Sequence, residues 1–123
     1  MIEIEKEYIG WDQVEEFIRD LSGELLNFNS HIKGIYAVPR GGLVLGVMLS
    51  HITKLPMLAA PCKDCIIIDD ISDTGKTLEV FREKNYLIAT LMYHKQTTVI
   101  PEIYKLEKKD NWIVFPWEIE GEE

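Results

Sequence analysis

One stretch, residues 66–77, restricts the fold of this chain more than any other. It opens with three consecutive isoleucines, which predict a short strand buried on both faces, as in a parallel sheet. Asp69 and Asp70 follow where that strand should end, and a turn of small and hydroxyl residues then leads into a predicted helix at 78–84. Backbone N–H groups, hydroxyls and the positive end of a helix dipole would gather there, which favours a phosphate site. The paired acids suit a metal ion or sugar hydroxyls.

Two other interpretations of this stretch must be considered. A Walker A loop needs a glycine five residues before its Gly-Lys-Thr, and that position holds Asp70, so this interpretation fails. The acids and threonines could also serve only as caps of a strand-to-helix turn, and on composition alone this alternative stays open.

The rest of the chain alternates predicted strands and helices, which indicates an α/β fold with a doubly wound parallel sheet. Ligands of such a sheet are expected at the carboxyl ends of its strands. The N-terminal helix has apolar residues at helical spacing, and Asp12 with Glu15 resembles a capping box. We expect strands at 4–9, 32–38, 55–60, 66–70 and 86–93, helices at 12–27 and 43–52, and an edge strand or extended connection at 96–106.

A second glycine-rich turn, residues 39–42, falls between the predicted strand at 32–38 and the helix that follows it. Its glycines allow the backbone to come close to a ligand, and the guanidinium of Arg40 can bind phosphate oxygens with two parallel hydrogen bonds. Taken alone, the same residues could form a tight turn with a surface arginine.

Together, these motifs resemble those of the type I phosphoribosyltransferases. The run Asp69-Asp70, two residues, Asp73-Thr74-Gly75, one residue and Thr77 resembles the binding motif for phosphoribosyl diphosphate (PRPP), and Ala-Val-Pro-Arg-Gly-Gly-Leu resembles the pyrophosphate loop. In relatives the peptide entering this arginine is often cis. Lys95, Asp110-Asn111-Trp112-Ile113 and Phe-Pro-Trp-Glu narrow the resemblance to bacterial xanthine–guanine phosphoribosyltransferases.

The resemblance implies transfer of the phosphoribosyl group from PRPP to a 6-oxopurine (xanthine, guanine or hypoxanthine), with release of pyrophosphate and with Mg²⁺ as cofactor. It also implies a role for each matched residue. Asp69 and Asp70 would bind Mg²⁺ and the ribose hydroxyls, and Asp73 would be the catalytic base. The pyrophosphate would be held by Arg40 and Gly41. The 5′-phosphate would be held by Thr74, Gly75, Lys76 and Thr77. The purine base would be bound by Lys95, Trp112 and Ile113.

Length and composition set the remaining expectations. The 123 residues suffice for one domain, 1–123, with a core at about 30–95 and a base-recognising hood at about 96–117 near the N-terminal helix. A net charge of −8 without a basic run argues against a nucleic-acid partner, and no apolar stretch or signal pattern indicates a membrane. We therefore expect a cytoplasmic protein, and the resemblance implies a homodimer or homotetramer. Cys62 and Cys65 are expected to be free thiols, buried or half-buried.

One segment departs from the family pattern. Relatives have a long flexible loop before the Asp-Asp strand, which closes over PRPP, whereas only Pro61 to Asp64 separate the two strands predicted here. A turn of that length cannot act as a lid. Two hypotheses remain open: an active enzyme with an open site, or a PRPP- or nucleotide-binding protein without catalytic activity.

Overall fold

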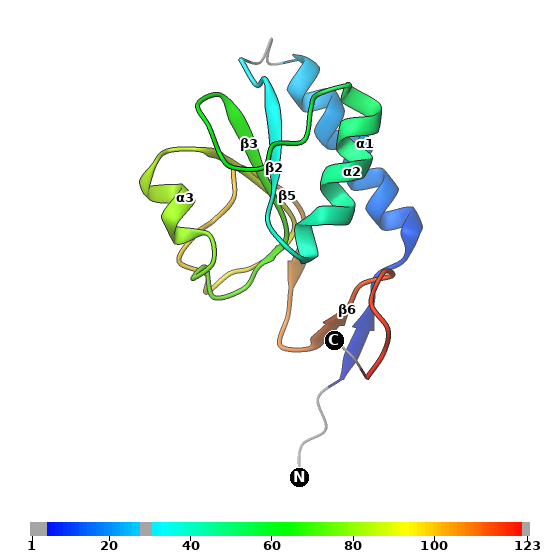
Figure 1. Cartoon of the computed structure of the whole chain (residues 1–123). Helices are drawn as coiled ribbons and strands as arrows, with labels where there is room; N and C mark the ends of the chain where they lie inside the picture. The colour runs from blue at the N-terminus through cyan, green and yellow to red at the C-terminus, as the bar shows by residue number, and fades with distance from the viewer. Residues whose placement is uncertain (1–4, 28–30, 122–123) are drawn as a thin grey trace.

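The main sheet has four parallel strands in the order β2-β3-β4-β5. The computed structural model describes residues 5–27 and 31–121 (Figure 1). A separate parallel pair consists of β1 and β6. The strands are β1 (Lys6–Tyr8), β2 (Gly34–Ala37), β3 (Cys65–Ser72), β4 (Leu87–His94), β5 (Ile103–Lys108) and β6 (Trp112–Val114).

Helices cover both faces of the main sheet. Helices α1 (Trp11–Asn27) and α2 (Gly41–Thr53) lie on one side, and α3 (Glu79–Glu83) lies on the other (Figure 1). The isoleucine run explains this arrangement, because successive strand side chains point to opposite faces. Ile66 and Ile68 join the core beneath α1 and α2, whereas Ile67 packs in the cluster beneath α3. The doubly wound parallel sheet predicted from the sequence is confirmed.

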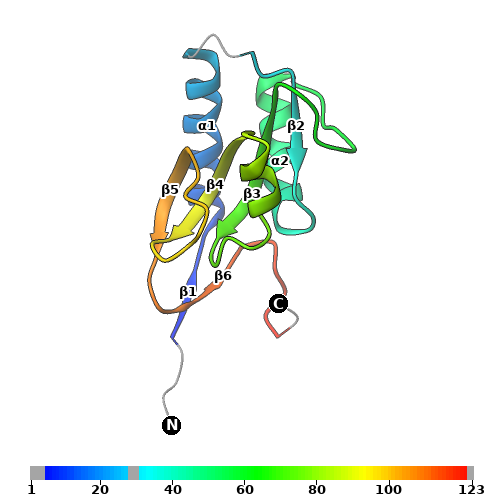
Figure 2. The ribbon, with the colours of Figure 1, turned by 90° about the vertical axis from the view of Figure 1, so that its left-hand side faces the viewer.

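The carboxyl ends of the four main strands point toward the small β1–β6 sheet (Figure 2). Strand β5, inside the 96–117 segment, forms the edge of the main sheet, and only β6 of that segment joins β1. Thus the chain after β4 first adds β5 to the main sheet. It then continues past the carboxyl ends of the main strands to form β6. No helix in the described ranges is long and apolar enough to span a membrane.

Two local predictions are wrong. The predicted capping box of Asp12 and Glu15 does not form, because the helix already begins at Trp11. Instead, the side-chain oxygen of Gln13 accepts the Gly10 N–H at 2.9 Å. Residues 55–60 form no named strand, although they run beside β2 with one bridge, Ile35 to Met57. The Leu58 N–H donates to the Ile35 carbonyl at 2.8 Å, but Pro56 has no N–H and cannot make the preceding bond of this ladder.

Candidate functional site

Loops at the carboxyl ends of β2 and β3 enclose a cavity of about 290 Å³. This is where ligands of an open α/β sheet are expected to bind. The structure therefore brings most of the predicted phosphate-site residues to one place. The lining residues are Pro39, Gly41, residues 69–75, Thr77 and Leu78.

The two predicted loops touch each other at Gly41. A Cβ atom on Gly41 would lie 2.1 Å from the Asp70 Oδ2 oxygen, so only glycine allows this approach. The peptide between Pro39 and Arg40 is cis, as expected from the sequence. Arg40 itself is exposed and directly precedes α2, beside the lining residues Pro39 and Gly41. The role of the Arg40 guanidinium in binding pyrophosphate stays a prediction.

Asp69 and Asp70 form an acidic pair that lines the cavity. The Asp69 side chain accepts the Asp70 N–H at 2.8 Å, and the Asp70 side chain accepts the Ile71 N–H at 2.7 Å. Burial raises the pKa of Asp69 to about 8, and the neighbouring Asp70 charge adds to this effect. Burial also raises the pKa of Asp70, against hydrogen bonds that lower it. The protein alone therefore disfavours two negative charges here.

A divalent cation would reverse this preference, because its charge stabilises the ionised carboxylates. Among the described residues, no cluster of three or more His, Cys, Asp or Glu side chains could hold a metal ion. Mg²⁺, however, usually keeps several waters and binds proteins through one or two carboxylates together with substrate phosphates. Two adjacent carboxylates, one buried and one half-buried, beside a predicted pyrophosphate loop fit a Mg²⁺ ion that arrives with a diphosphate.

The predicted phosphate loop is held in shape by a segment of the chain that follows β4. Gly75 has a φ of +94°, and a Cβ atom there would lie 2.3 Å from the Thr98 hydroxyl oxygen. The Thr98 N–H also donates to the Thr74 carbonyl at 3.0 Å. Only glycine fits this conformation and this contact, so the loop can curve tightly around an anion.

Helix α3 contributes less to this loop than the sequence suggested. It spans only five residues and begins at Glu79 rather than directly after Thr77. A helix this short has little macrodipole, because the dipole sums over aligned peptide units. The predicted anion would therefore be held mainly by the N–H groups of the loop itself and by the hydroxyls of Thr74 and Thr77.

The predicted base-binding residues lie outside the residues that line the cavity. Lys95 is exposed in the turn after β4, Trp112 is 47% exposed at the start of β6, and Ile113 is buried. The backbone N–H of Trp112 donates to the Glu5 carbonyl at 2.8 Å, which fixes the backbone at this position. The roles of these three residues stay predictions.

Two features of the site were not predicted from the sequence. The buried Ser72 hydroxyl donates to the Val99 carbonyl at 2.6 Å and lies 2.8 Å from the Thr97 hydroxyl, which ties the 97–99 segment to the end of β3. Lys108, at the end of β5, donates to the Asp73 carboxylate at 3.0 Å. A lysine far from Asp73 in the sequence gives no signal of this contact, so only the fold reveals this ion pair.

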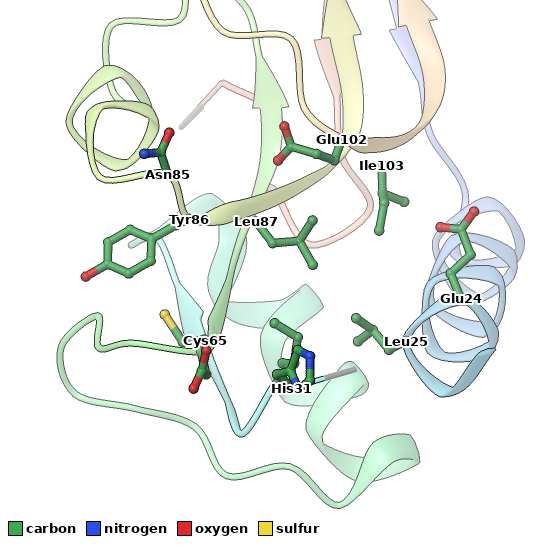
Figure 3. A pocket seen from close by; sticks show the side chains of 11 residues that line it. Glu24, Leu25, His31, Cys65, Asn85, Tyr86, Leu87, Glu102 and Ile103 are labelled. Carbon is green, nitrogen blue, oxygen red and sulfur yellow. The ribbon is translucent and has the colours of Figure 1, made fainter. Parts of the chain in front are cut away.

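A larger cavity, of about 530 Å³, lies at the opposite ends of the strands (Figure 3). Cys65, Leu87 and Ile103, which begin β3, β4 and β5, line it. None of the predicted site residues does, so we place the candidate site in the smaller cavity. Both cysteines are free, as expected, but Cys62 is exposed and only Cys65 is buried, where burial raises the pKa of its thiol.

Comparison with known proteins assigns the family. No protein-family model matches the chain. A crystal structure of a purine phosphoribosyltransferase from Pyrococcus horikoshii matches at 34% identity and a TM-score of 0.80, over 94% of this chain and 95% of that one. The chain belongs to the purine phosphoribosyltransferase family. Two xanthine–guanine phosphoribosyltransferases are also similar to this chain. The one from Gluconobacter oxydans is 24% identical over 89% of this chain and 83% of the relative. The one from Desulfotalea psychrophila is 26% identical over 93% of this chain and 87% of the relative.

In this chain, residues 54–64 alone join α2 to β3. Their backbone is engaged with the sheet: the Ile35 N–H donates to the Pro56 carbonyl at 2.9 Å, and the Lys33 N–H donates to the Asp64 carbonyl at 2.7 Å. The connection therefore lies along β2 and leaves no long loop to close over the cavity from this position.

Proposed function

We propose that the protein transfers the phosphoribosyl group of PRPP to a 6-oxopurine and releases pyrophosphate. The observation that carries this proposal is that the two predicted phosphate loops and the Asp69–Asp70 carboxylate pair line one cavity. Membership of the purine phosphoribosyltransferase family supports the reaction class. We also propose a cytoplasmic location and, as in the family resemblance, a dimer or tetramer.

Each loop has a distinct part in the reaction. Residues 74–77 would hold the 5′-phosphate, Arg40 and the Gly41 backbone would hold the pyrophosphate, and Asp69 with Asp70 would orient the ribose hydroxyls. Mg²⁺, bound at this pair, would supply positive charge that neutralises the departing pyrophosphate. Because the transition state has oxocarbenium character, the fixed carboxylates would stabilise it most when ionised.

Asp73 is the proposed general base. It lies at the edge of the cavity beyond β3, and its side chain is 48% exposed. A carboxylate there can take the proton that leaves the imidazole ring of the purine when a ring nitrogen attacks the anomeric carbon. The base would lie between Asp73 and the segment that carries Trp112, whose ring offers a flat apolar face. Lys95 and Ile113 complete the predicted base site.

The short 54–64 connection favours a second candidate, a binding protein without turnover. Without a lid, bound PRPP would keep contact with water, which weakens electrostatic stabilisation of the transition state. The intact Asp73 favours the enzyme, because a protein that only binds PRPP needs no base for proton transfer.

One experiment separates the two candidates. Purified protein is incubated with PRPP, Mg²⁺ and xanthine, guanine, hypoxanthine or adenine, and nucleoside monophosphate is quantified, while PRPP binding is measured by calorimetry. Product with the 6-oxopurines, lost in Asp73→Asn, establishes the transferase. Binding without product establishes the second candidate. Absence of both binding and product refutes the proposal.

A further inference from the structure

A closed ring of hydrogen bonds joins the end of β3 to the chain segment that follows β4. The Ser72 hydroxyl donates to the Val99 carbonyl at 2.6 Å, so its oxygen accepts from the Thr97 hydroxyl at 2.8 Å. The Val99 N–H closes the ring by donating to the Thr97 hydroxyl oxygen at 3.2 Å. Because Ser72 is 1% exposed and Thr97 is 9% exposed, water competes little for these bonds. The ring therefore fixes residues 97–99 against β3.

Thr98 lies between two members of this ring and contacts the predicted phosphate loop. Its N–H and its hydroxyl both donate to the Thr74 carbonyl, at 3.0 and 3.2 Å. The peptide between Thr74 and Gly75 is trans, and the carbonyl and N–H of a trans peptide point in opposite directions. The Gly75 N–H therefore points away from Thr98.

The Gly75 N–H is placed to bind an anion. Gly75 is buried, and no group in the described part of the chain accepts a hydrogen bond from its N–H. A buried N–H without a partner is unfavourable, so a ligand oxygen that accepts from it stabilises this conformation. Thr74 and Gly75 line the cavity, whereas Thr97 and Thr98 do not. Thr98 thus holds the peptide from outside and leaves its N–H for a phosphate in the cavity, as in other anion sites built from backbone N–H groups.

Resting on the function proposed above, we propose that Ser72 and Thr97 are positioning residues for the 5′-phosphate. Their hydroxyls are bound to each other and to the 97–99 backbone, so they would act without touching the ligand. They hold Thr98 in place, and Thr98 fixes the peptide unit whose N–H binds the phosphate. Loss of the ring should therefore weaken the binding of the 5′-phosphate and leave the binding of the nucleoside unchanged.

The test compares two ligands that differ only in this phosphate, guanosine monophosphate and guanosine. Affinities are measured by calorimetry, with guanosine also measured by displacement of the nucleotide, so the test does not depend on turnover. Ser72→Ala and Thr97→Val each break the ring, whereas Thr97→Ser keeps the hydroxyl. Thr53→Val is the matched control, because its hydroxyl donates to a backbone carbonyl at 2.7 Å at the end of α2 remote from the cavity. Circular dichroism and urea midpoints check that each variant is folded.

We expect wild type to bind the nucleotide more tightly than guanosine. Ser72→Ala and Thr97→Val should each reduce this ratio of affinities by about two- to tenfold, as for loss of one neutral hydrogen bond. Thr97→Ser and Thr53→Val should leave the ratio nearly unchanged. A ring that serves only to stabilise the fold would lower the urea midpoint without changing the ratio, which would overturn the inference and leave the proposed function standing.

Two further results have distinct meanings. If the ring variants do not fold, Thr98→Val decides, because it removes one of the two bonds to the Thr74 carbonyl at an exposed position. It should reduce the ratio by about twofold, and an unchanged ratio would overturn the inference. If wild type binds the nucleotide no more tightly than guanosine, or binds neither, the predicted phosphate loop holds no phosphate. The proposed function then fails, and this inference fails with it.

Discussion

Replacing Asp69 by Asn should stabilise the protein at neutral pH, by an amount that grows with pH. Burial, with the Asp70 charge adding to it, raises the pKa of Asp69 from 3.8 to about 8. Between these values the folded protein retains a proton that the unfolded chain has released, so stability falls as pH rises through this window. One pKa unit corresponds to about 1.4 kcal/mol, so this group should cost wild type about 2–3 kcal/mol between pH 5 and pH 7.

The asparagine variant keeps an oxygen that can accept the Asp70 N–H, now 2.8 Å from Asp69 Oδ1, but it cannot ionise. We expect it to exceed wild type in the free energy of unfolding by about 3–4 kcal/mol at pH 7 and by about 1–2 kcal/mol at pH 5. Urea unfolding followed by circular dichroism at pH 5, 6, 7 and 8, without Mg²⁺, measures both. Asp12→Asn, which removes an exposed carboxylate in the first turn of α1, is the control for the loss of one acidic side chain. Equal pH dependence in wild type and Asp69→Asn would refute the buried-charge argument.

Three further predictions concern the chemistry and the loops. Asp73→Asn should lower turnover by roughly 10²–10⁴ and leave PRPP affinity within a few fold, and unchanged turnover would exclude Asp73 as the base. Gly75→Ala should cost at least about 1–2 kcal/mol of unfolding free energy and weaken PRPP binding, because φ is +94° and the Thr98 hydroxyl is in the way. Gly23→Ala in α1, where nothing lies within 4 Å, should instead stabilise the protein slightly, and similar effects of the two variants would contradict the loop argument. Turnover should stay below about 1 per second, with PRPP affinity that weakens with salt, and faster steady-state turnover would mean that another segment closes the cavity.

The sequence predicted those parts of the fold that depend on local patterns. Three isoleucines in a row, with helical spacing before them and glycine-rich turns around them, were enough to indicate a parallel sheet with loops at its carboxyl ends. The strand expected at 55–60 failed, because apolar content alone does not show whether the backbone can donate. Pro56 removes a donor that a longer ladder beside β2 would need.

The candidate site could be predicted only where its residues are close together in the sequence. Asp69, Asp70 and the following loop share one strand-to-helix turn, so their proximity follows from local structure. Lys108 reaches Asp73 because β5 pairs with β4 in a fixed register, and 35 residues separate the two partners in the chain. A register shift of one residue in β5 would turn Lys108 to the other face of the sheet. The Lys108–Asp73 ion pair therefore depends on the position of an edge strand, and substitutions that alter the pairing of β5 should break this ion pair even when the loops after β2 and β3 are unchanged.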